Sequence, residues 1–478
     1  MNKKTVINNL GKILLVEAIL MIPPALIALL YGETDDFISF VCTIIPVAII
    51  SLLCMRVKGT KLSAKDGYVI VSSAWVCMSL IGAVPLYLSG AFRSFVDAFF
   101  EIVSGFTTTG ASVMDDPGVL GHGVQFFRCF SHWVGGMGVL VFVLMIMPME
   151  NDNSMHLVRA EVPGPTSGKL VPRMRTTSRI LYGMYAALTL VLAIILMCLK
   201  MPLYDAVCYA FGTAGTGGFS ICAEGFALYN NPAIEYVIAV FMLLFGVNFN
   251  LYYLIILGKI KDFFKNEELR VYACIVVFSV TAICINIYGM IGNFADTLRL
   301  SLFQVASIST TTGFATADFS TWPQFSQHIL VLLMIMGACA GSTAGGFKIS
   351  RVIILWKSFV AEIRTLINPK QIIKVRVNGE VVDEKTLRSS RVYCAGYFII
   401  ICLSVLVLSL NELDFTTNVT AVLACFNNIG PGLGLVGPAL NYSVYSDPAQ
   451  LLLSILMITG RLEIFPMFMI FARSAHDR

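Results

Sequence analysis

Long apolar runs separated by short polar segments recur from one end of the chain to the other. A helix needs roughly 20 apolar residues to cross the hydrocarbon core of a bilayer, which is about 30 Å thick. Ten runs of this kind can be counted, and the first two, residues 13–30 and 38–55, predict a plain helix hairpin. The pattern therefore predicts an all-α membrane protein with about ten transmembrane helices.

The first run follows Lys3 and Lys4, so its charge pattern imitates a secretory signal peptide. Its apolar part is longer than that of a signal peptide, Pro23 and Pro24 interrupt it, and no small-residue cleavage site precedes Glu33. A cleaved signal is the alternative. We expect a retained first helix with a cytoplasmic N-terminus.

A second pattern repeats four times after the hairpin: a long apolar run, a short amphipathic segment, a polar motif rich in Gly, Thr or Asn, and another long apolar run. The motifs are TTTGAS (107–112), GTAGTGGFS (212–220), STTTGFAT (309–316) and NNIGPGLG (427–434). Their key glycines, 107, 96 and 117 residues apart, are Gly110, Gly217, Gly313 and Gly430. This spacing fits two membrane crossings and one re-entrant segment per repeat.

The periodicity divides the chain into six predicted parts. A two-helix hairpin takes residues 1–60, and a basic cytoplasmic linker takes 361–391. The four repeats cover 61–150, 151–265, 266–360 and 392–478.

The short segment before each motif has roughly 9 to 16 residues, too few to cross a bilayer. Each has an aspartate near its start: Asp97, Asp205, Asp296 and Asp414. Aspartate is a favoured N-cap residue, and its charge complements the positive end of the helix dipole. We therefore predict four Asp-capped half-helices whose C-termini point at the polar motifs.

Basic residues are distributed unevenly under this topology. If the four motifs face outside, the outer segments hold only four of the 33 Lys and Arg residues: Arg93, Arg128, Lys200 and Arg299. Basic residues favour the cytoplasmic side. The segments near 56–66, 150–180, 259–270 and 357–391, and the C-terminus, are therefore expected in the cytoplasm of a multi-pass protein of the bacterial plasma (inner) membrane.

Composition supports this class, with 57% hydrophobic residues, 13% charged residues and a mean hydropathy of +0.80, outside the soluble globular range. The longest polar stretches, about 30 to 35 residues, leave no room for a soluble enzyme domain. Thirteen cysteines and five histidines show no disulfide-like or metal-ligand spacing. We expect membrane lipid as surroundings, no organic cofactor and no nucleic-acid partner.

The four motifs suggest one shared chemistry. Non-helical backbone at membrane depth is tolerated where protein surrounds it or where it lines a water-filled path. A ring of backbone carbonyls can replace the hydration shell of a monovalent cation, and glycine permits the backbone angles that this requires. The motifs hold no carboxylate or basic residue, which argues against divalent cations and anions. Helix packing by small residues is the alternative for any one motif, but fourfold repetition favours an ion filter.

These motifs, together with HWVGGMGVLVF (132–142), GACAGSTAGGFK (337–348) and GRLEIFP (460–466), resemble the Trk/Ktr/HKT superfamily of potassium transporters. The leading hairpin is similar to that of its TrkH-type potassium-uptake subunits. The resemblance implies four membrane–pore-loop–membrane repeats around one pore. It also implies a homodimer with one pore per subunit and a cytoplasmic nucleotide-binding regulatory subunit of the TrkA type.

The resemblance also implies a potassium-binding filter, in which a glycine in each loop favours potassium over sodium. Gly110 occupies the position where some sodium-transporting plant members have serine. The implied metal site, for potassium, consists of Thr108, Thr109, Gly110, Gly215, Thr216, Gly217, Thr311, Thr312, Gly313, Asn428, Ile429 and Gly430. The second and fourth motifs depart from TTTG, so their register stays open by about one residue.

A glycine-rich run interrupts the second long helix of the third repeat at 337–346. The low helix propensity of glycine makes a break plausible. The spacing of Gly337, Gly341 and Gly345 equally fits a small-residue packing face. The resemblance implies an intramembrane gating loop beneath the filter, which would include Gly346 and end near Lys348.

Arg461 lies about thirteen residues into the last apolar run, roughly 20 Å from its outer end. A charge at that depth usually faces a cavity or a partner, although a snorkelling anchor is the alternative. We expect Arg461 to form, with the glycine-rich loop, a barrier to resting conduction, and Glu463 to offset its charge.

Three functions are compatible with a membrane protein of this kind. The leading hypothesis is potassium-selective uptake, with channel-like conduction gated by a cytoplasmic regulatory subunit. A proton- or sodium-coupled potassium symporter is the alternative, although carriers usually show twofold inverted repeats. A membrane-embedded enzyme is not expected, because the sequence has no HExxH motif, no nucleophile–base constellation and no Walker-type nucleotide motif.

Overall fold

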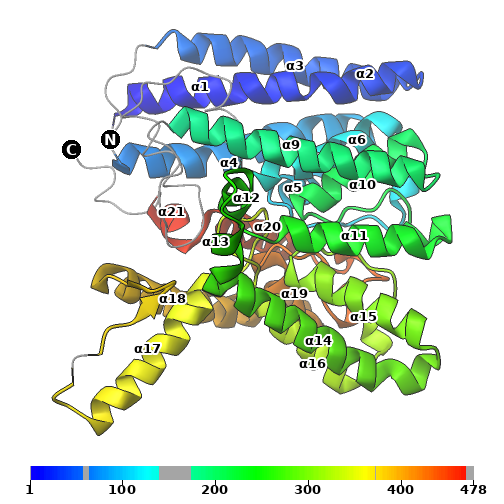
Figure 1. Cartoon of the computed structure of the whole chain (residues 1–478). Helices are drawn as coiled ribbons and strands as arrows, with labels where there is room; N and C mark the ends of the chain where they lie inside the picture. The colour runs from blue at the N-terminus through cyan, green and yellow to red at the C-terminus, as the bar shows by residue number, and fades with distance from the viewer. Residues whose placement is uncertain (1, 58–63, 139–173, 372, 470–478) are drawn as a thin grey trace.

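The N-terminal hairpin lies along one side of a helical bundle (Figure 1). The computed structural model describes residues 2–57, 64–138, 174–371 and 373–469. The hairpin consists of α1 (Lys3–Leu20), α2 (Ile22–Leu30) and α3 (Thr34–Met55). A new helix starts after Met21 because Pro23 and Pro24 lie in its first turn, where proline is tolerated. The first helix begins at Lys3, about ten residues before the apolar run 13–30 that predicts it.

Four repeats follow, each with a long helix, a half-helix and a second helix. The first contains α4 (Ala64–Leu88), α5 (Phe95–Phe106) and α6 (His122–Gly136). The second contains α9 (Met174–Cys198), α10 (Leu203–Gly215), α11 (Pro232–Phe245), α12 (Phe249–Ile256) and α13 (Ile260–Lys265). The third contains α14 (Glu267–Ile291), α15 (Phe294–Ser309), α16 (Gln324–Ile335) and α17 (Ile349–Ile367). The fourth contains α18 (Glu384–Leu408), α19 (Phe415–Phe426), α20 (Asp447–Leu462) and α21 (Ile464–Met469).

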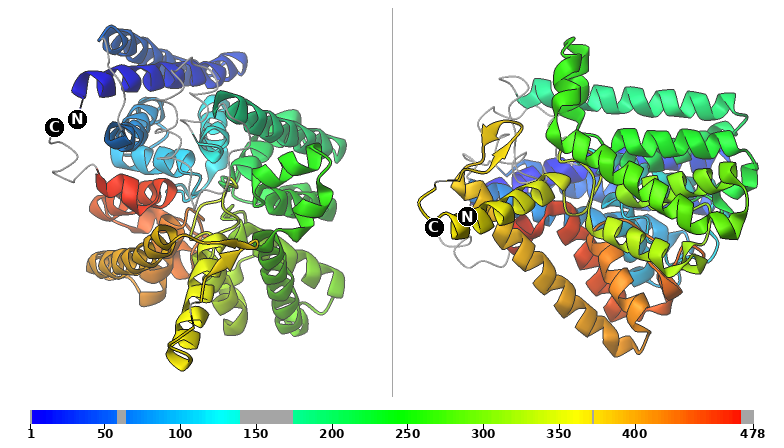
Figure 2. Two further views of the ribbon diagram at one scale, coloured as in Figure 1. Left: turned by 60° about the vertical axis from the view of Figure 1, so that its left-hand side comes forward. Right: turned by 60° about the horizontal axis from the view of Figure 1, so that its bottom comes forward.

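The repeats are arranged in chain order around a common centre (Figure 2). Each repeat packs on the next, through the helix pairs α6 with α10, α11 with α15, α16 with α19, and α20 with α5. The last pair joins the end of the chain to its beginning and closes the ring. Short 3-10 helices lie in the loops: η1 (Pro117–Val119), η2 (Gly225–Tyr229), η3 (Phe319–Thr321), η4 (Ser409–Asn411), η5 (Gly434–Val436) and η6 (Tyr442–Val444).

Six segments of the described chain are long and apolar enough to cross a membrane, and the pair α11–α12, bent by 91°, makes a seventh. In three of the four repeats the helix after the half-helix is shorter than a full membrane span. Helix α6 ends next to residues outside the described ranges, α16 stops at the glycine-rich run, and α20 breaks at Glu463. In the described residues these three do not reach the length of a full span by themselves. The prediction of an all-α, multi-pass fold with a hairpin and four pore-loop repeats is confirmed.

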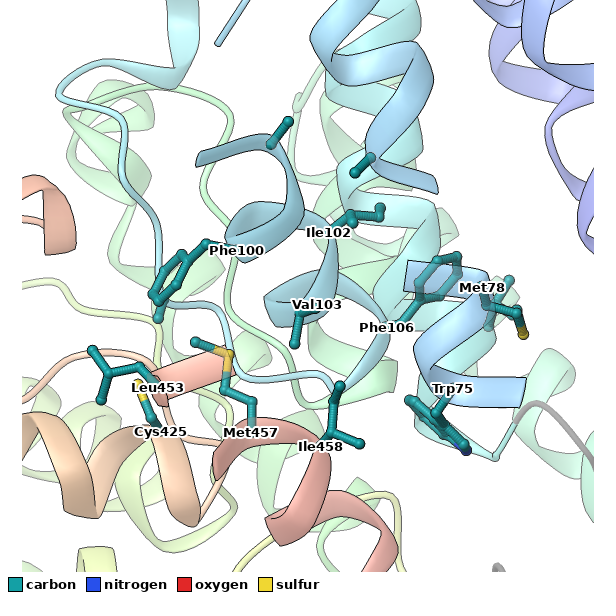
Figure 3. Close-up of a cluster of buried hydrophobic side chains, with 14 of the residues drawn as sticks. Trp75, Met78, Phe100, Ile102, Val103, Phe106, Cys425, Leu453, Met457 and Ile458 are labelled. Carbon is teal, nitrogen blue, oxygen red and sulfur yellow. The ribbon is translucent and has the colours of Figure 1, made fainter. Parts of the chain in front are cut away.

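The half-helices are packed deeply inside the bundle. In α5 Ala98 and every residue from Phe100 to Phe106 are buried. Figure 3 shows Phe100 and Val103 of α5 facing Met457 of α20, with Phe106 on the side of α4. Packing of this kind, rather than exclusion of water, holds helices together in lipid. It fixes the position of the loop that follows Phe106.

The predicted aspartate caps are correct for only one of the four half-helices. Asp414 caps α19, where its Oδ2 accepts a hydrogen bond from the Thr417 amide at 2.9 Å. The other N-cap residues are Ser94, Pro202 and Asn293. The predicted aspartates there lie in the first turn instead, where their charge still complements the helix dipole.

The end of the bundle that holds the start of α1 also holds α17 and α21 (Figure 1). The interval expected as a basic linker, 361–391, is largely structured: α17 continues to Ile367, and strands β1 (Arg376–Val377) and β2 (Glu380–Val381) form an antiparallel hairpin before α18. The basic segment near 150–180 lies mostly outside the described residues, as do part of 56–66 and the C-terminal residues 470–478.

Candidate functional site

The four half-helices end in the same backbone conformation. One residue in each motif has left-handed backbone, at Thr108, Thr216, Thr311 and Asn428, with φ between 54° and 56°. The next amide donates to a carbonyl five residues back, in the pairs Thr109 to Ser104, Gly217 to Gly212, Thr312 to Ser307 and Ile429 to Ala424, at 2.8 to 2.9 Å. This is the Schellman arrangement of a helix C-terminus. Threonine rarely adopts this conformation, and such strain gathers at functional sites.

The shared conformation fixes the register of each loop. The glycines with positive φ that follow are Gly110, Gly218, Gly313 and Gly430. The third and fourth motifs keep the expected register. In the second motif the residue equivalent to Gly110 is Gly218, so the expected set, Gly215 to Gly217, begins one residue too early. Gly215 is the last residue of α10, and its carbonyl belongs to the helix end.

The four glycines close the loops into a ring. A Cβ added to Gly110 would lie 1.9 Å from the carbonyl oxygen of Gly217 in the second loop. The equivalent distances are 2.0 Å from Gly218 to Thr312 O and 1.9 Å from Gly313 to Ile429 O. The ring closes with 2.8 Å from Gly430 to Thr109 O. Each glycine therefore lies against the carbonyl that precedes the glycine of the next loop, and no side chain fits at any of the four positions.

Buried side chains hold the first two loops from behind. Glu101 and Arg128 are 0% and 1% exposed and form an ion pair, with Arg128 Nε 2.9 Å from Glu101 Oε1. Glu101 also accepts from the Val113 amide at 3.1 Å, just after the first motif. The Arg128 guanidinium lies 4.2 Å from the centre of the Phe219 ring, near the end of the second motif. The pair therefore joins the two loops.

His132 supports the second loop from α6. Its Nδ1 lies 2.9 Å from the Gly105 carbonyl oxygen, and its Nε2 accepts from the Phe219 amide at 3.3 Å. These contacts define a neutral ring with the proton on Nδ1. A Cβ on Gly217 would lie 2.1 Å from this ring, so a side chain is excluded there as well.

The sequence predicts no role for His132, and Arg128 enters the predicted topology only as an outer charge. A signal was present for the ion pair, because Glu101 and Arg128 are charged residues inside short apolar helices, where a charge needs a partner. Spacing along the chain does not reveal which partner it has.

A cavity of ≈ 210 Å³ opens above the ring. All four glycines of the ring line it, and so do the carboxylates Asp115 and Glu224. A mouth that combines carbonyl oxygens with acidic side chains attracts cations. The described residues contain no cluster of three or more His, Cys, Asp or Glu side chains that would suit a transition metal.

The glycine-rich run lies directly beneath the ring as a non-helical loop. Helix α16 ends at Ile335 and α17 begins at Ile349, so the run does not form one face of a continuous helix. The Gly345 amide donates to the hydroxyl of Thr311 at 2.7 Å. A Cβ on Gly345 would lie 2.7 Å from the Asn427 carbonyl oxygen, and one on Gly337 would lie 2.4 Å from the Gly345 carbonyl. Gly341 and Gly346 have positive φ.

Arg461 joins this loop to the first repeat. Its Nη1 donates to the Thr343 carbonyl at 2.8 Å, and its Nη2 donates to the Gly135 and Gly136 carbonyls, both at 2.6 Å. The side chain is 9% exposed, so it is turned into the protein and does not snorkel to the surface. The guanidinium therefore spans the space under the ring from α6 to the loop.

Further contacts anchor the loop from below. Glu268 Oε1 accepts from the Ala340 and Ser350 amides at 2.7 and 3.0 Å. Lys348 is buried, caps α17 and donates through Nζ to the Ala344 carbonyl. Glu463, expected to offset Arg461, forms an ion pair with Arg351 at 2.6 Å. The ion pair links the first turn of α17 to the break after α20.

Comparison with known proteins identifies relatives of this arrangement. Residues 33–477 match the TrkH family, described as a cation transport protein. The Trk system potassium uptake protein TrkG of Escherichia coli is 35% identical over 462 residues, covering 95% of this chain and 94% of TrkG. The Trk system potassium uptake protein TrkH of Salmonella typhimurium is 32% identical, covering 94% of each chain. The crystal structure of the potassium transporter TrkH from Vibrio parahaemolyticus aligns with a TM-score of 0.89 at 29% identity, covering 100% of both chains.

Proposed function

This chain belongs to the TrkH family of cation transport proteins, and we propose that it takes up potassium ions across the bacterial plasma (inner) membrane through the ring of four loops. The observation that carries the proposal is the closed ring, in which each glycine lies against a carbonyl of the next loop. Carbonyl oxygens held at fixed spacing replace the water around a monovalent cation. The potassium ion is the transported substrate, and the ring binds it transiently.

The filter residues in this proposal follow the register of the backbone. They are Thr108, Thr109, Gly110, Thr216, Gly217, Gly218, Thr311, Thr312, Gly313, Asn428, Ile429 and Gly430. The C-terminal ends of the four half-helices point toward the ring, and their partial negative charge favours a cation there.

Conduction in this proposal is channel-like and gated beneath the filter. The glycine-rich loop and Arg461 occupy the space under the ring, where a fixed positive charge opposes the passage of a cation. Opening then requires the loop to leave its contacts with Arg461 and Glu268. The first turn of α17, held to Glu463 by Arg351, connects the loop to the cytoplasmic end of the bundle.

Regulation is proposed to come from a nucleotide-binding subunit of the TrkA type in the cytoplasm, acting on a homodimer. Support for the dimer is the outer face of α17, where large apolar side chains are exposed: Trp356, Phe359, Ile363, Leu366 and Ile367. Uncovered apolar surface of this extent marks a contact site. The basic residues between Lys357 and Arg391 offer charge for an acidic surface of the regulatory subunit.

Flux measurements in liposomes test the proposal. The purified chain should carry Rb⁺ and K⁺ faster than Na⁺, and Gly218→Ala should reduce that preference, because a Cβ there meets the Thr312 carbonyl. Gly183→Ala on α9, where a Cβ meets open space, is the matched control. Flux that saturates and requires a gradient of protons or sodium would instead favour a coupled symporter.

A further inference from the structure

Glu17 is a buried carboxyl group in the middle of the hairpin's first membrane segment. The segment Lys3–Leu30 has 28 residues, and Glu17 lies near its centre, roughly 20 Å from either end. The residue is 1% exposed, and neither carboxylate oxygen has a hydrogen-bond partner among the described residues. It belongs to the hairpin and not to the four repeats that form the ring.

The surroundings of Glu17 are apolar, with a few uncompensated polar atoms. Its carboxylate faces α4, where a Cβ on Gly82 would lie 3.6 Å from Oε1. On the same helix Ser79 is fully buried, and its hydroxyl, like the Trp75 Nε1, has no partner in the described chain. The titratable side chain that interacts electrostatically with Glu17, within the described ranges, is Cys77 of α4. No basic group of α3 or α4 pairs with it there.

An ionised carboxylate in such a place is strongly disfavoured. Burial of an unpaired charge in a low-dielectric interior is opposed by several kcal/mol, so such a group takes up a proton or binds a counter-ion. A metal cation would need a shell of several oxygens. The contacts at Gly82 and Cys77 supply none, and Ser79 of α4 has one unpaired hydroxyl.

We propose that Glu17 is an intramembrane proton-binding site, occupied at neutral pH, at the contact between the N-terminal hairpin and the first repeat. Its ligand is a single proton, held as the carboxylic acid. The acid has one hydroxyl group to donate, and the Ser79 hydroxyl, one turn from Gly82 on α4, is an available acceptor.

Gly82 lies between Glu17 and α5, the half-helix that leads to the first loop of the ring. The Cβ position of Gly82 that faces Glu17 also lies 2.9 Å from Ile102 and 3.0 Å from Phe106 of α5. Phe106 directly precedes the first motif. Loss of the proton would place an unpaired charge against this tight contact, so the hairpin would move away from α4 to hydrate it.

Infrared difference spectroscopy on the full-length protein in lipid tests the proposal at pH 7. Subtraction of the Glu17→Gln spectrum from wild type should leave a protonated-carboxyl C=O band and no carboxylate band. Loss of carboxylate bands instead would overturn the proposal. Glu33→Gln is the matched control, because Glu33 accepts hydrogen bonds from the His122 and Gly123 amides and should contribute carboxylate bands.

If Glu17→Gln assembles poorly, a second variant and a second measurement still test the proposal. Glu17→Met, similar in volume and uncharged, should give the same difference spectrum. The thermal stability of wild type should also fall as the pH rises above about 4.3, the ordinary pKa of a glutamate, because the folded state keeps a proton that the unfolded state releases. The Met variant should lack that part of the pH dependence. Parallel pH dependence in the two proteins would contradict a proton on Glu17.

Discussion

Gly430 in the fourth loop lies against the carbonyl oxygen of Thr109 in the first loop, at 2.8 Å from the position that a Cβ would take. The two residues are at opposite ends of the set of repeats, and their contact closes the ring. Asn428 adds a hydrogen bond from its Nδ2 to the Thr109 hydroxyl at 3.1 Å. The size of the opening is thus set by all four loops together.

Arg461→Ala should raise resting flux. The substitution removes hydrogen bonds from a charged group to carbonyls of the loop and of α6, each worth about 1.5–3 kcal/mol. If even one of these opposes opening, Rb⁺ flux into liposomes without a regulatory subunit should rise about tenfold. Arg299→Ala, in an ion-paired arginine of α15, should leave resting flux unchanged. Equal resting flux in wild type and Arg461→Ala would remove Arg461 from the gate.

Glu101→Gln should destabilise the protein and blunt its selectivity. Arg128 would be left buried without a charged partner, a change that typically costs about 3–5 kcal/mol. The Val113 amide would also lose its carboxylate acceptor. Thermal unfolding in detergent and K⁺/Na⁺ flux ratios measure the two effects. Asp97→Asn on the same half-helix should cost about 0.3–1 kcal/mol through the helix dipole alone. A Glu101 variant no less stable than Asp97→Asn would contradict the account.

Acid should loosen the end of the hairpin where α2 meets α3 through Glu33. Burial raises the pKa of this carboxyl, but hydrogen bonds from the Gly123 and His122 amides and from the His122 ring outweigh burial, so its pKa is lowered from the ordinary value. The folded state then binds fewer protons than the unfolded state, and the contribution to stability is complete above about pH 4.3. It is lost as the pH falls through the lowered pKa.

Unfolding temperature measured from pH 6 to pH 3 checks this prediction. Glu33→Gln should flatten the acid limb of the curve, whereas Asp35→Asn, at an exposed neighbouring position, should not. An unchanged acid limb in Glu33→Gln would mean that the Glu33–His122 contact does not contribute to acid stability.

Phe359→Arg should dissociate the proposed homodimer. Phe359 is 59% exposed on the outer face of α17, beside Trp356 and Ile363 on the same side of the helix. A charge in the centre of an apolar contact opposes association. Light scattering of the detergent-solubilised protein should shift from dimer to monomer mass. Phe264→Arg, at an exposed aromatic of α13, is the control. A dimer that survives Phe359→Arg would place the interface elsewhere.

The sequence predicts the hairpin, the half-helices and the polar loops because each depends on local length and polarity. The register of the second loop could not be predicted. The run GTAGTGG offers several glycines, and only the contact with Thr312 of the third loop selects Gly218. Similarly, Ser94 and Asn293 compete with aspartate for the N-cap, and hydrogen-bond geometry decides the outcome.

The sequence indicates that the charged residues behind the loops need partners, but it does not predict which residues those partners are. Glu101 and Arg128 are 27 residues apart on different helices, and Arg461 reaches a carbonyl 326 residues away. Such partners follow from the packing of α5, α6 and α20 and not from any spacing within the chain. The strand hairpin after α17 was not predicted because each strand has only two residues, too few to give a recognisable alternating pattern.

The most direct test of the ring is the K⁺/Na⁺ flux ratio of Gly110→Ser in liposomes, measured beside wild type and Gly289→Ser. A Cβ at Gly110 would lie 1.9 Å from the Gly217 carbonyl, whereas one at Gly289 on α14 meets open space. The account predicts that the ratio falls about tenfold or more in Gly110→Ser, a change of about 1.4 kcal/mol in discrimination, and stays at the wild-type value in Gly289→Ser. A wild-type ratio in Gly110→Ser would contradict the claim that these four loops select the ion.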